Sequence, residues 1–233
     1  MPQTSEQQPS LNQQTTTKRG LARQKKFLDV AEEVFLSKGY AGTSVNEIVC
    51  LSGGSLGTLY RLFGNKLGLF EAVFKKKSKE LFGHFEEETH WSDDIENSLF
   101  NFGQTLQRIA LSPDGTAIYR LVITENNLDQ GEIQKIFYRY GPQTAIDMLK
   151  NYLQKQIDAG RLELENPQLA ATQFLEMIKG PFVLRALFGE TITVDEMDAA
   201  LYQALHIFLQ GCKTTSQGQK TQPKSLLFKE KSI

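Results

Sequence analysis

The stretch from Thr43 to Phe70 constrains the fold more than any other part of the chain. It contains two short segments with helical spacing of apolar residues, separated by the Gly-rich corner Ser52-Gly53-Gly54. Thr43 is a suitable N-cap for the first segment. The second segment, Ser55 to Phe63, carries small polar residues, an Arg and a Tyr where a buried helix would have a continuous apolar face. The pattern predicts two helices joined by a tight turn, with one face of the second helix left open.

Apolar residues elsewhere recur at three- and four-residue intervals, which predicts further helices. The expected helices cover Leu21 to Lys38, Thr43 to Leu51, Ser55 to Phe63, Asn65 to Phe85, Ser92 to Leu111, Thr116 to Asn127, Ile133 to Ala159, Pro167 to Phe188 and Val194 to Gly211. Asn65, Ser92 and Asn166 are the expected caps, and Pro142 predicts a kink or a break in the seventh helix. The sequence shows no strand alternation of useful length. We therefore expect an all-α fold of about nine helices.

The formal charge of −1 conceals an uneven distribution. Residues 1–83 contain 12 Lys and Arg against 7 Asp and Glu, a balance of +5, so residues 84–233 carry −6. This asymmetry suggests that only the front of the chain meets a polyanion. The basic residues around the start of the first helix have two open interpretations, a solvated helix start or an arm that contacts phosphates or a minor groove. They are Lys18, Arg19, Arg23, Lys25 and Lys26.

The two cysteines give little support to a metal site or a disulfide. Cys50 and Cys212 are far apart and follow no metal-ligand spacing, and we predict no metal and no cofactor. Cys50 lies in the apolar run Ile48 to Leu51, so we expect a buried thiol, with a redox sensor as the lesser alternative. No N-terminal segment resembles a signal peptide and no apolar run reaches the roughly 18 residues of a membrane span. We expect a cytoplasmic protein without a membrane partner.

Gly53-Gly54-Ser55-Leu56-Gly57 matches the G-x-S-x-G pattern of serine hydrolases. That pattern is functional where a strand precedes it and a helix follows it in an α/β sheet, whereas here a predicted helix precedes it. The histidines, His84, His90 and His206, fall in helical or helix-boundary patterns. The Lys-Ser/Thr ending of a phosphate-binding loop is also missing. A hydrolase that uses Ser55 is therefore the weakest alternative, and we predict no catalytic residue.

The same residues fit a helix-turn-helix that reads DNA. Such a motif inserts the N-terminal part of its second helix into the major groove, where side chains must be small or polar. Ser55, Thr58 and Arg61 suit base edges, Gly57 permits close backbone approach, and Tyr60 can reach a phosphate. Leu59 and Phe63 are better interpreted as core. The predicted DNA contacts are Thr43, Ser55, Leu56, Gly57, Thr58, Tyr60, Arg61 and Lys66.

A family resemblance follows from these residues. Gly39-Tyr40, Thr43, Ile48, Gly53, Ser55, Gly57-Thr58-Leu59-Tyr60, Phe63, Lys66 and Leu69-Phe70 resemble the N-terminal signature of the TetR (tetracycline-repressor) family, over about residues 20 to 70. The segment from Tyr119-Arg120-Leu121-Val122 through Gly141-Pro142, Gly160-Arg161-Leu162 and Leu169-Ala170-Ala171 to Gly180 resembles the AefR-like C-terminal domain of that family. The resemblance implies an all-helical homodimer with a DNA-binding unit, a connecting fourth helix and a C-terminal ligand-binding domain.

Three positions depart from the family pattern. Gly54 stands where a β-branched residue or Ala is usual, Leu56 where Lys is frequent, and Leu62 where an aromatic residue is common. Gly54 is expected to loosen the helix start by up to roughly 1 kcal/mol. Leu56 removes a phosphate contact but can touch a thymine methyl group. These departures bear on operator sequence and affinity, and not on the fold.

The predicted domain order follows from the resemblance and the composition. It is a disordered Gln-, Thr- and Ser-rich arm (1–20), a helix-turn-helix domain (21–66), a regulatory domain (67–211) and a flexible tail (212–233). We expect the two helices within Pro167 to Gly211 to form a dimer across a two-fold axis, so that the pair matches a palindromic operator.

The expected function is that of a repressor released from DNA by an unidentified small molecule, which binds among the fifth to eighth helices. The predicted pocket residues are Phe102, Tyr119, Tyr138, Met148, Tyr152, Phe174 and Met177. They combine aromatic rings and flexible thioethers with a few polar atoms, as apolar ligand sites do, although each is also suited to an ordinary core. A non-catalytic adaptor whose basic front binds another partner is the main alternative function.

Overall fold

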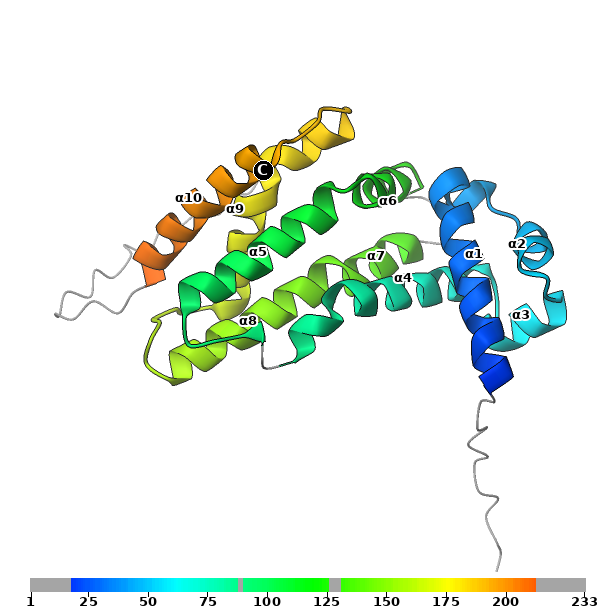
Figure 1. Ribbon diagram of the computed structural model, residues 1–233, viewed down its shortest axis with the longest axis horizontal. Helices are drawn as coiled ribbons and strands as arrows, with labels where there is room; N and C mark the ends of the chain where they lie inside the picture. The colour runs from blue at the N-terminus through cyan, green and yellow to red at the C-terminus, as the bar shows by residue number, and fades with distance from the viewer. Residues whose placement is uncertain (1–17, 88–89, 126–130, 213–233) are drawn as a thin grey trace, which may run out of the picture.

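The computed structural model describes residues 18–87, 90–125 and 131–212, which form ten α-helices and one 3-10 turn (Figure 1). They are α1 (Lys18–Gly42), α2 (Val45–Ser52), α3 (Leu56–Phe63), α4 (Lys66–Phe82), η1 (Gly83–Glu86), α5 (Ile95–Leu111), α6 (Pro113–Thr124), α7 (Glu132–Tyr140), α8 (Pro142–Asp158), α9 (Pro167–Leu187) and α10 (Val194–Cys212). Within those ranges no β-strand occurs, which confirms the predicted all-α class. Pro142 breaks the expected seventh helix into α7 and α8, so ten helices replace the expected nine.

The helices α1 to α3 lie together at one end of the molecule (Figure 1). α1 buries Phe27, Ala31, Val34 and Phe35, the face that the sequence predicts. The helix begins at Lys18, so it includes the last three residues of the predicted arm; residues 1–17 lie outside the described part. Gly39, where the helix was expected to end, has a φ of 72° and kinks the chain. Glycine suits this position, because that conformation is costly for residues with a Cβ.

The corner between α2 and α3 is formed by glycine and serine. Gly53 ends α2 in the left-handed conformation, with a φ of 65°, and its amide reaches back to the carbonyl oxygens of the last turn. Ser55 is the N-cap of α3, and its hydroxyl oxygen accepts a hydrogen bond from the amide of Thr58 at 3.2 Å. The prediction that Thr43 caps α2 is wrong, because Ser44 holds the N-cap position, although its side chain makes no capping bond.

α4 connects the α1–α3 end to the other helices. The Asn65 side chain caps it as predicted, by accepting from the Gly68 amide at 2.7 Å. Phe70 packs edge-on against Phe35 and Tyr40, with ring centroids 5.1 Å apart in both pairs. The helix ends at Phe82 and continues as the 3-10 turn, so it is shorter than the predicted helix to Phe85.

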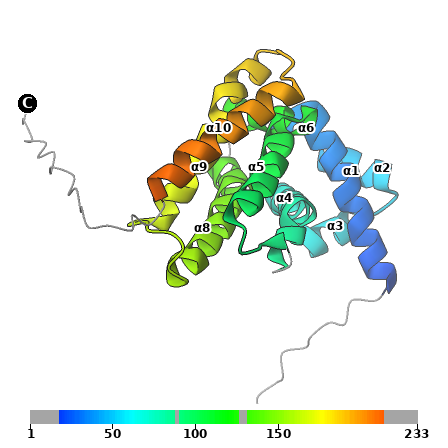
Figure 2. The same ribbon diagram turned by 60° about the vertical axis from the view of Figure 1, so that its left-hand side comes forward.

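The helices α5, α8, α9 and α10 enclose the larger of two hydrophobic clusters (Figure 2). Asn166 caps α9 as predicted, by accepting from the Leu169 amide at 2.9 Å. The cap of α5 is Asp94 and not the predicted Ser92, since the Asp94 carboxylate accepts from the Asn97 amide at 3.0 Å. Ser92 instead uses its backbone amide to donate to the Ser98 hydroxyl at 3.0 Å, which ties the preceding loop to α5.

The smaller cluster is shared between the N-terminal helices and the bundle. It contains Phe27, Phe35 and Phe70, and also Leu121 and Val122 of α6 and Ile133 and Ile136 of α7. α6 and α7 therefore help to close the core of the helix-turn-helix end. A displacement of α6 or α7 must disturb side chains that also support α1 and α4, since protein interiors are close-packed.

Candidate nucleic-acid interface and ligand cavity

The outer face of α3 exposes most of the predicted DNA contacts. Ser55, Leu56, Gly57, Tyr60 and Arg61 are exposed, with Tyr60 at 47% and Leu56 at 38%. The Ser55 and Thr58 hydroxyls lie 3.0 Å apart, so the cap also orients the Thr58 side chain. On the opposite face, Leu59 is fully buried and Phe63 packs edge-on against Phe27 with ring centroids 6.2 Å apart. The predicted division of α3 into an open polar face and a core face is present in the structure.

Two glycines at this corner have different reasons to be glycine. A Cβ at Gly57 would meet no atom within 4 Å among the described residues, so space outside the protein is open at that position. A Cβ at Gly54 would overlap the ring of Phe27, which is itself fully buried. Gly54 therefore also has a packing role that its helix propensity does not reveal, because the Phe27 ring occupies the volume next to it.

A basic hollow lies between the start of α1 and α3. Its wall includes Arg19, Lys26 and Arg61 together with Thr58. Arg23 has a structural role at the same place, because its guanidinium donates to the carbonyl oxygens of Ser52 and Gly53, at 3.2 and 2.7 Å, and so caps the end of α2. The remaining cations of the wall face the same side of the molecule as the open face of α3.

Thr43 and Lys66 are directed toward the protein more than predicted. Thr43 is 4% exposed; its amide donates to the Tyr40 carbonyl at 3.3 Å and its hydroxyl to the Gly39 carbonyl at 2.6 Å. Both groups that were expected to meet DNA are thus used within the turn after α1, which corrects the prediction for Thr43. The Lys66 ammonium lies 4.5 Å from the centre of the Tyr40 ring and 3.4 Å from the Ala41 carbonyl oxygen.

Cys50 is exposed, so the predicted buried thiol is wrong. The apolar run from Ile48 to Leu51 winds around α2, and only Ile48 is fully buried, while Leu51 is 57% exposed. The error arose because a run of four apolar residues covers a whole turn of a helix, of which one side faces the core. Ser55 likewise does not form a hydrolase elbow, since helix α2 precedes it where that fold requires a strand.

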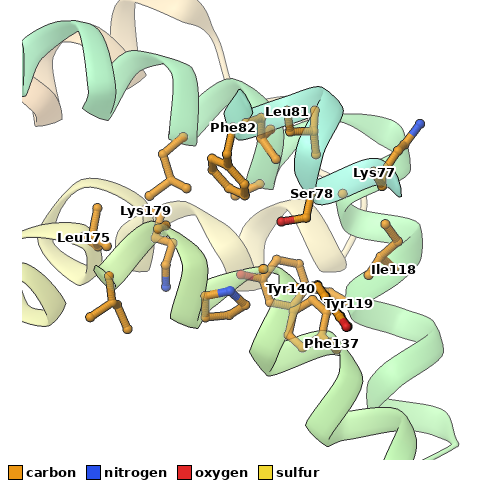
Figure 3. A pocket seen from close by; sticks show the side chains of 18 of the residues that line it. Lys77, Ser78, Leu81, Phe82, Ile118, Tyr119, Phe137, Tyr140, Leu175 and Lys179 are labelled. Carbon is orange, nitrogen blue, oxygen red and sulfur yellow. The ribbon is translucent and has the colours of Figure 1, made fainter. Parts of the chain in front are cut away.

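A cavity of about 110 Å³ lies between the helices α4 to α9 (Figure 3). Five aromatic side chains line it, namely Phe74, Phe82, Tyr119, Phe137 and Tyr140. Tyr119 and Phe137 meet edge to face with centroids 5.3 Å apart, and Phe137 meets Phe74 in the same way at 6.5 Å. The volume is smaller than the roughly 300–1,000 Å³ of pockets that hold drug-sized ligands. In this conformation the cavity suits a small apolar molecule.

The polar residues on the cavity wall are Lys77 and Ser78 of α4, Tyr119 of α6, Tyr140 of α7, and Thr172, Glu176 and Lys179 of α9. Lys77 pairs with Glu32 of α1, and Lys179 pairs with Glu176 at 2.5 Å. Burial, and secondly the Glu176 charge, raise the pKa of Tyr119, so its hydroxyl remains protonated and able to donate near neutral pH.

Tyr119 alone of the seven predicted pocket residues lines this cavity. Phe102, Tyr152 and Phe174 are buried in the bundle core, Met148 and Met177 pack at its edge, and Tyr138 is 51% exposed on the outside of α7. Tyr152 stacks on Trp91 at 4.5 Å and donates to the Ser92 carbonyl at 2.8 Å. The missed wall residues come from six helices, with the largest shares from α4 and α9. Helical periodicity does not show how these helices are turned against one another.

Glu125 joins the end of α6 to the turn after α1. One carboxylate oxygen accepts from the Ala41 amide at 3.0 Å, and the other lies where a side chain on Gly39 would stand. A second link joins α7 to α4, because Arg139 and Tyr140 both donate to the same oxygen of Glu71 at 3.0 Å. The cavity helices α6 and α7 therefore each hold a polar contact with the N-terminal helices.

The outer faces of α9 and α10 expose large apolar side chains. They are Leu184 (63%), Phe188 (83%), Val194 (56%), Tyr202 (59%) and Ile207 (53%). Exposed apolar groups of this size are typical of surfaces that bind another protein, although Tyr202 also packs against Phe100 of α5 with ring centroids 5.0 Å apart. No helix in the described part of the chain is long and apolar enough to cross a lipid bilayer.

Comparisons with known proteins agree with this architecture. The family model "Bacterial regulatory proteins, tetR family" matches residues 27–73, and the model "AefR-like transcriptional repressor, C-terminal domain" matches residues 97–211. The chain is 27% identical over 188 residues to the HTH-type transcriptional regulator YvkB of Bacillus subtilis (strain 168), which covers 80% of this chain and 95% of YvkB.

Solved structures share the fold at lower sequence identity. A TetR-family regulator from Mesorhizobium loti aligns with a TM-score of 0.74 and 22% identity over 85% of this chain and all of that one. The flavonoid-responsive regulator FrrA aligns with a TM-score of 0.69 and 23% identity, covering 82% and 97% of the two chains. Bacillus subtilis FadR in complex with stearoyl-CoA aligns at 0.60 and 19% over 80% and 98%. With the two family models and this architecture together, the chain belongs to the TetR family of DNA-binding transcriptional regulators and carries an AefR-like C-terminal domain.

Proposed function

We propose that the protein is a dimeric repressor that binds a palindromic operator through α3 and is released by a small molecule. The observation that carries the proposal is the open face of α3. Ser55, Thr58 and Arg61 present hydroxyl and guanidinium groups, and Gly57 has open space outside it. These groups suit base edges in a major groove, where a residue without a side chain lets the helix approach closely.

The basic hollow supports a phosphate contact beside this face. Arg19 and Lys26 of α1 border the same hollow as Arg61 of α3, so a DNA strand on α3 would pass along these cations. This placement favours the phosphate interpretation of Arg19 and Lys26 over a merely solvated helix start. Tyr60, which is 47% exposed, is positioned on the outer face to donate its hydroxyl to a neighbouring phosphate.

Dimerisation through α9 and α10 would bury their exposed apolar side chains. Leu184 and Phe188 of α9, with Tyr202 and Ile207 of α10, would then form the centre of a helical bundle across a two-fold axis. Two α3 helices held in this way can match half-sites one turn of DNA apart, roughly 34–36 Å. The dimer is thus the device that gives a short recognition helix sufficient affinity and specificity.

The cavity is the proposed effector site, and the helices around it are the proposed switch. α4, α6 and α7 line the cavity. The end of α6 contacts α1, and α7 contacts α4, both near the DNA-binding end. A ligand that binds better when these helices are displaced would favour a conformer in which the α3 helices no longer match the operator. FrrA is flavonoid-responsive and FadR binds stearoyl-CoA, which supports a small-molecule effector here.

A gel shift with the DNA upstream of the protein's own gene tests the proposal. We expect sequence-specific binding that weakens steeply as salt rises, because phosphate contacts release counterions. Tyr60→Ala and Arg61→Ala are expected to weaken it, while the matched cation variant Lys135→Ala, on the exposed side of α7, leaves it unchanged. Binding that is equally strong to unrelated DNA, or equally strong in all three variants, would contradict a regulator that reads DNA through α3.

A further inference from the structure

The charges around the cavity are already balanced by groups of the protein. Lys179 is only 14% exposed and pairs with Glu176. Lys77 pairs with Glu32 and has Asp114 at 4.0 Å. Its neighbour Lys76 has three carboxylate partners, which are Asp29 at 2.6 Å, Glu32 at 3.2 Å and Glu80 at 3.6 Å.

Lys77 and its neighbour Lys76 together have four acidic partners, which lie behind the cavity wall and not on it. The Lys77 charge is therefore already compensated by carboxylates of the protein. An anionic ligand would have to displace Glu32 from Lys77 or Glu176 from Lys179 before it gained a partner of its own. Burying a carboxylate without such a partner is strongly unfavourable.

Two hydroxyl groups on the wall have no hydrogen-bond partner among the described residues. They belong to Ser78 of α4 and Tyr119 of α6 (Figure 3). Each can donate and accept one neutral hydrogen bond, and the raised pKa keeps the Tyr119 group protonated. An oxygen atom on a ligand would satisfy either hydroxyl, whereas a purely apolar ligand would leave both unpaired.

The aromatic part of the cavity wall favours ligands that contain an aromatic ring, and the small volume excludes large ligands. Phe74, Phe137 and Tyr119 already meet edge to face, and Phe82 and Tyr140 complete the aromatic lining. Flat aromatic ligands gain offset-stacked or edge-to-face contacts with such rings beyond the burial of apolar area. The volume of about 110 Å³ admits at most a single ring in this conformation, so a two-ring compound requires the helices to separate.

We propose that the effector is an uncharged one- or two-ring aromatic compound whose hydroxyl or carbonyl oxygen pairs with Tyr119, and that anionic analogues are rejected. The inference rests on the proposed function, because it assigns a chemical class to the cavity named there as the effector site. The cavity is expected to select against acidic ligands, because the lysines on its wall pair with the protein's own carboxylates and do not recruit an acidic ligand.

Isothermal titration of the full-length protein at pH 7 with 2-naphthol and with 2-naphthoate tests this class. The two probes share one ring frame and differ in charge. We expect 2-naphthol to bind at least about tenfold more tightly than 2-naphthoate. Tyr119→Phe is expected to weaken 2-naphthol binding by about three- to tenfold, the range that one neutral hydrogen bond supplies. Tyr138→Phe removes an equivalent hydroxyl from the outside of α7 and is expected to leave the affinity unchanged.

Several results would overturn the inference. These are equal or tighter binding of 2-naphthoate, identical affinities for the Tyr119 and Tyr138 variants, or no heat from either probe at millimolar concentration. Circular dichroism of both variants shows whether the helices are retained. The gel shift of the unliganded protein is scored separately. Operator binding without the expected probe selectivity rejects the ligand class alone, whereas absence of specific operator binding rejects the proposed function whatever the titration shows.

Discussion

The outer face of α3 and the outer faces of α9 and α10 are both helical surfaces left open in the described chain, and they differ in chemistry. α3 presents Ser55, Thr58 and Arg61 next to further cations of α1. α9 and α10 present Leu184, Phe188 and other large apolar groups. The first surface suits a hydrated polyanion and the second suits removal from water. The same secondary structure therefore presents two surfaces suited to different kinds of partner, and the exposed side chains make the difference.

The two surfaces also differ in what lies beneath them. α3 rests on a small aromatic cluster in which Gly54 leaves room for Phe27, and α6 and α7 complete that cluster. α9 and α10 rest on the larger cluster of the bundle. Because α4, α6 and α7 contribute to both the small cluster and the cavity wall, a ligand in the proposed effector cavity would act on the support of α3 and not on α3 itself.

The largest expected effect comes from charging the apolar surface. Leu184→Lys combined with Phe188→Lys places two ammonium groups where a dimer would bury them, so we expect a monomer and an operator affinity reduced at least about 100-fold. Light scattering after gel filtration and a gel shift measure the two effects. Tyr138→Lys is the control, because Tyr138 is similarly exposed on α7. A double variant that remains dimeric would show that the apolar faces of α9 and α10 have another use.

The contact between Gly39 of α1 and Glu125 at the end of α6 gives the second-largest expected effect. Gly39→Ala forces a side chain into a φ of 72° and against Glu125, and we expect it to lower the free energy of unfolding by about 1–2 kcal/mol. In a Glu125→Ala background the clash is gone, so the same substitution should cost less there. Urea unfolding of the four proteins checks the difference. Equal costs in both backgrounds would mean that the Glu125 carboxylate does not press on Gly39.

The ion pairs between α1 and α4 give a smaller, pH-dependent effect. Burial alone would raise the pKa of Glu32, but hydrogen bonds from Lys77 and Lys76 outweigh it and hold the pKa below the ordinary 4.5. A lowered carboxyl pKa stabilises the fold above pH 4.5 and loses that effect as pH falls through the lower value.

Glu32→Gln is therefore expected to reduce stability at pH 7 by about 1 kcal/mol, and the difference from the unmodified protein should narrow below about pH 4. Thermal unfolding across pH measures the difference. Glu33→Gln, at the next and exposed position of α1, is the control. A difference that stays constant from pH 7 to pH 3 would show that the charge of Glu32 is not the cause.

The smallest effect compares one cysteine in each region. Cys50 is exposed on α2, so Cys50→Ser should change the free energy of unfolding by less than about 0.5 kcal/mol. Cys212 is buried at the end of α10, and burial raises the pKa of its thiol. Cys212→Ser should cost about 1 kcal/mol. A thiol reagent should label Cys50 rapidly and Cys212 slowly; the reverse order would contradict the placement of both helices.

The sequence was more informative about the α3 region than about the cavity, for a physical reason. Most of the predicted DNA contacts lie on one short helix, where spacing relates Ser55, Thr58 and Arg61 to one face and Leu59 to the other. Caps and breaks are also local, so Asn65, Asn166 and Pro142 were predictable. The cavity instead combines side chains of six helices. Helical periodicity marks Phe102 and Phe137 alike as apolar, and only the crossing of the helices decides which one faces a void.

Other errors came from groups whose partners are distant in sequence. Helix propensity alone does not reveal that a side chain at Gly54 would overlap the ring of Phe27, which is 27 positions earlier in the chain. Thr43 looked like a free cap because its hydrogen bond to Gly39 depends on the kink in α1. No local pattern marks Glu125 as a structural residue, since its contact with Ala41 spans 84 positions of the chain. Each of these depends on tertiary packing that no local pattern encodes.

We propose that an apolar dimer surface holds two polar α3 faces against one DNA molecule, and a hydroxyl-radical footprint of the operator tests this arrangement directly. We expect such a dimer to protect two half-sites one helical turn apart, about 10 base pairs, and both protections to be lost together in the Leu184 and Phe188 double variant. Protection of a single half-site, or two half-sites that survive in a monomeric double variant, would contradict it.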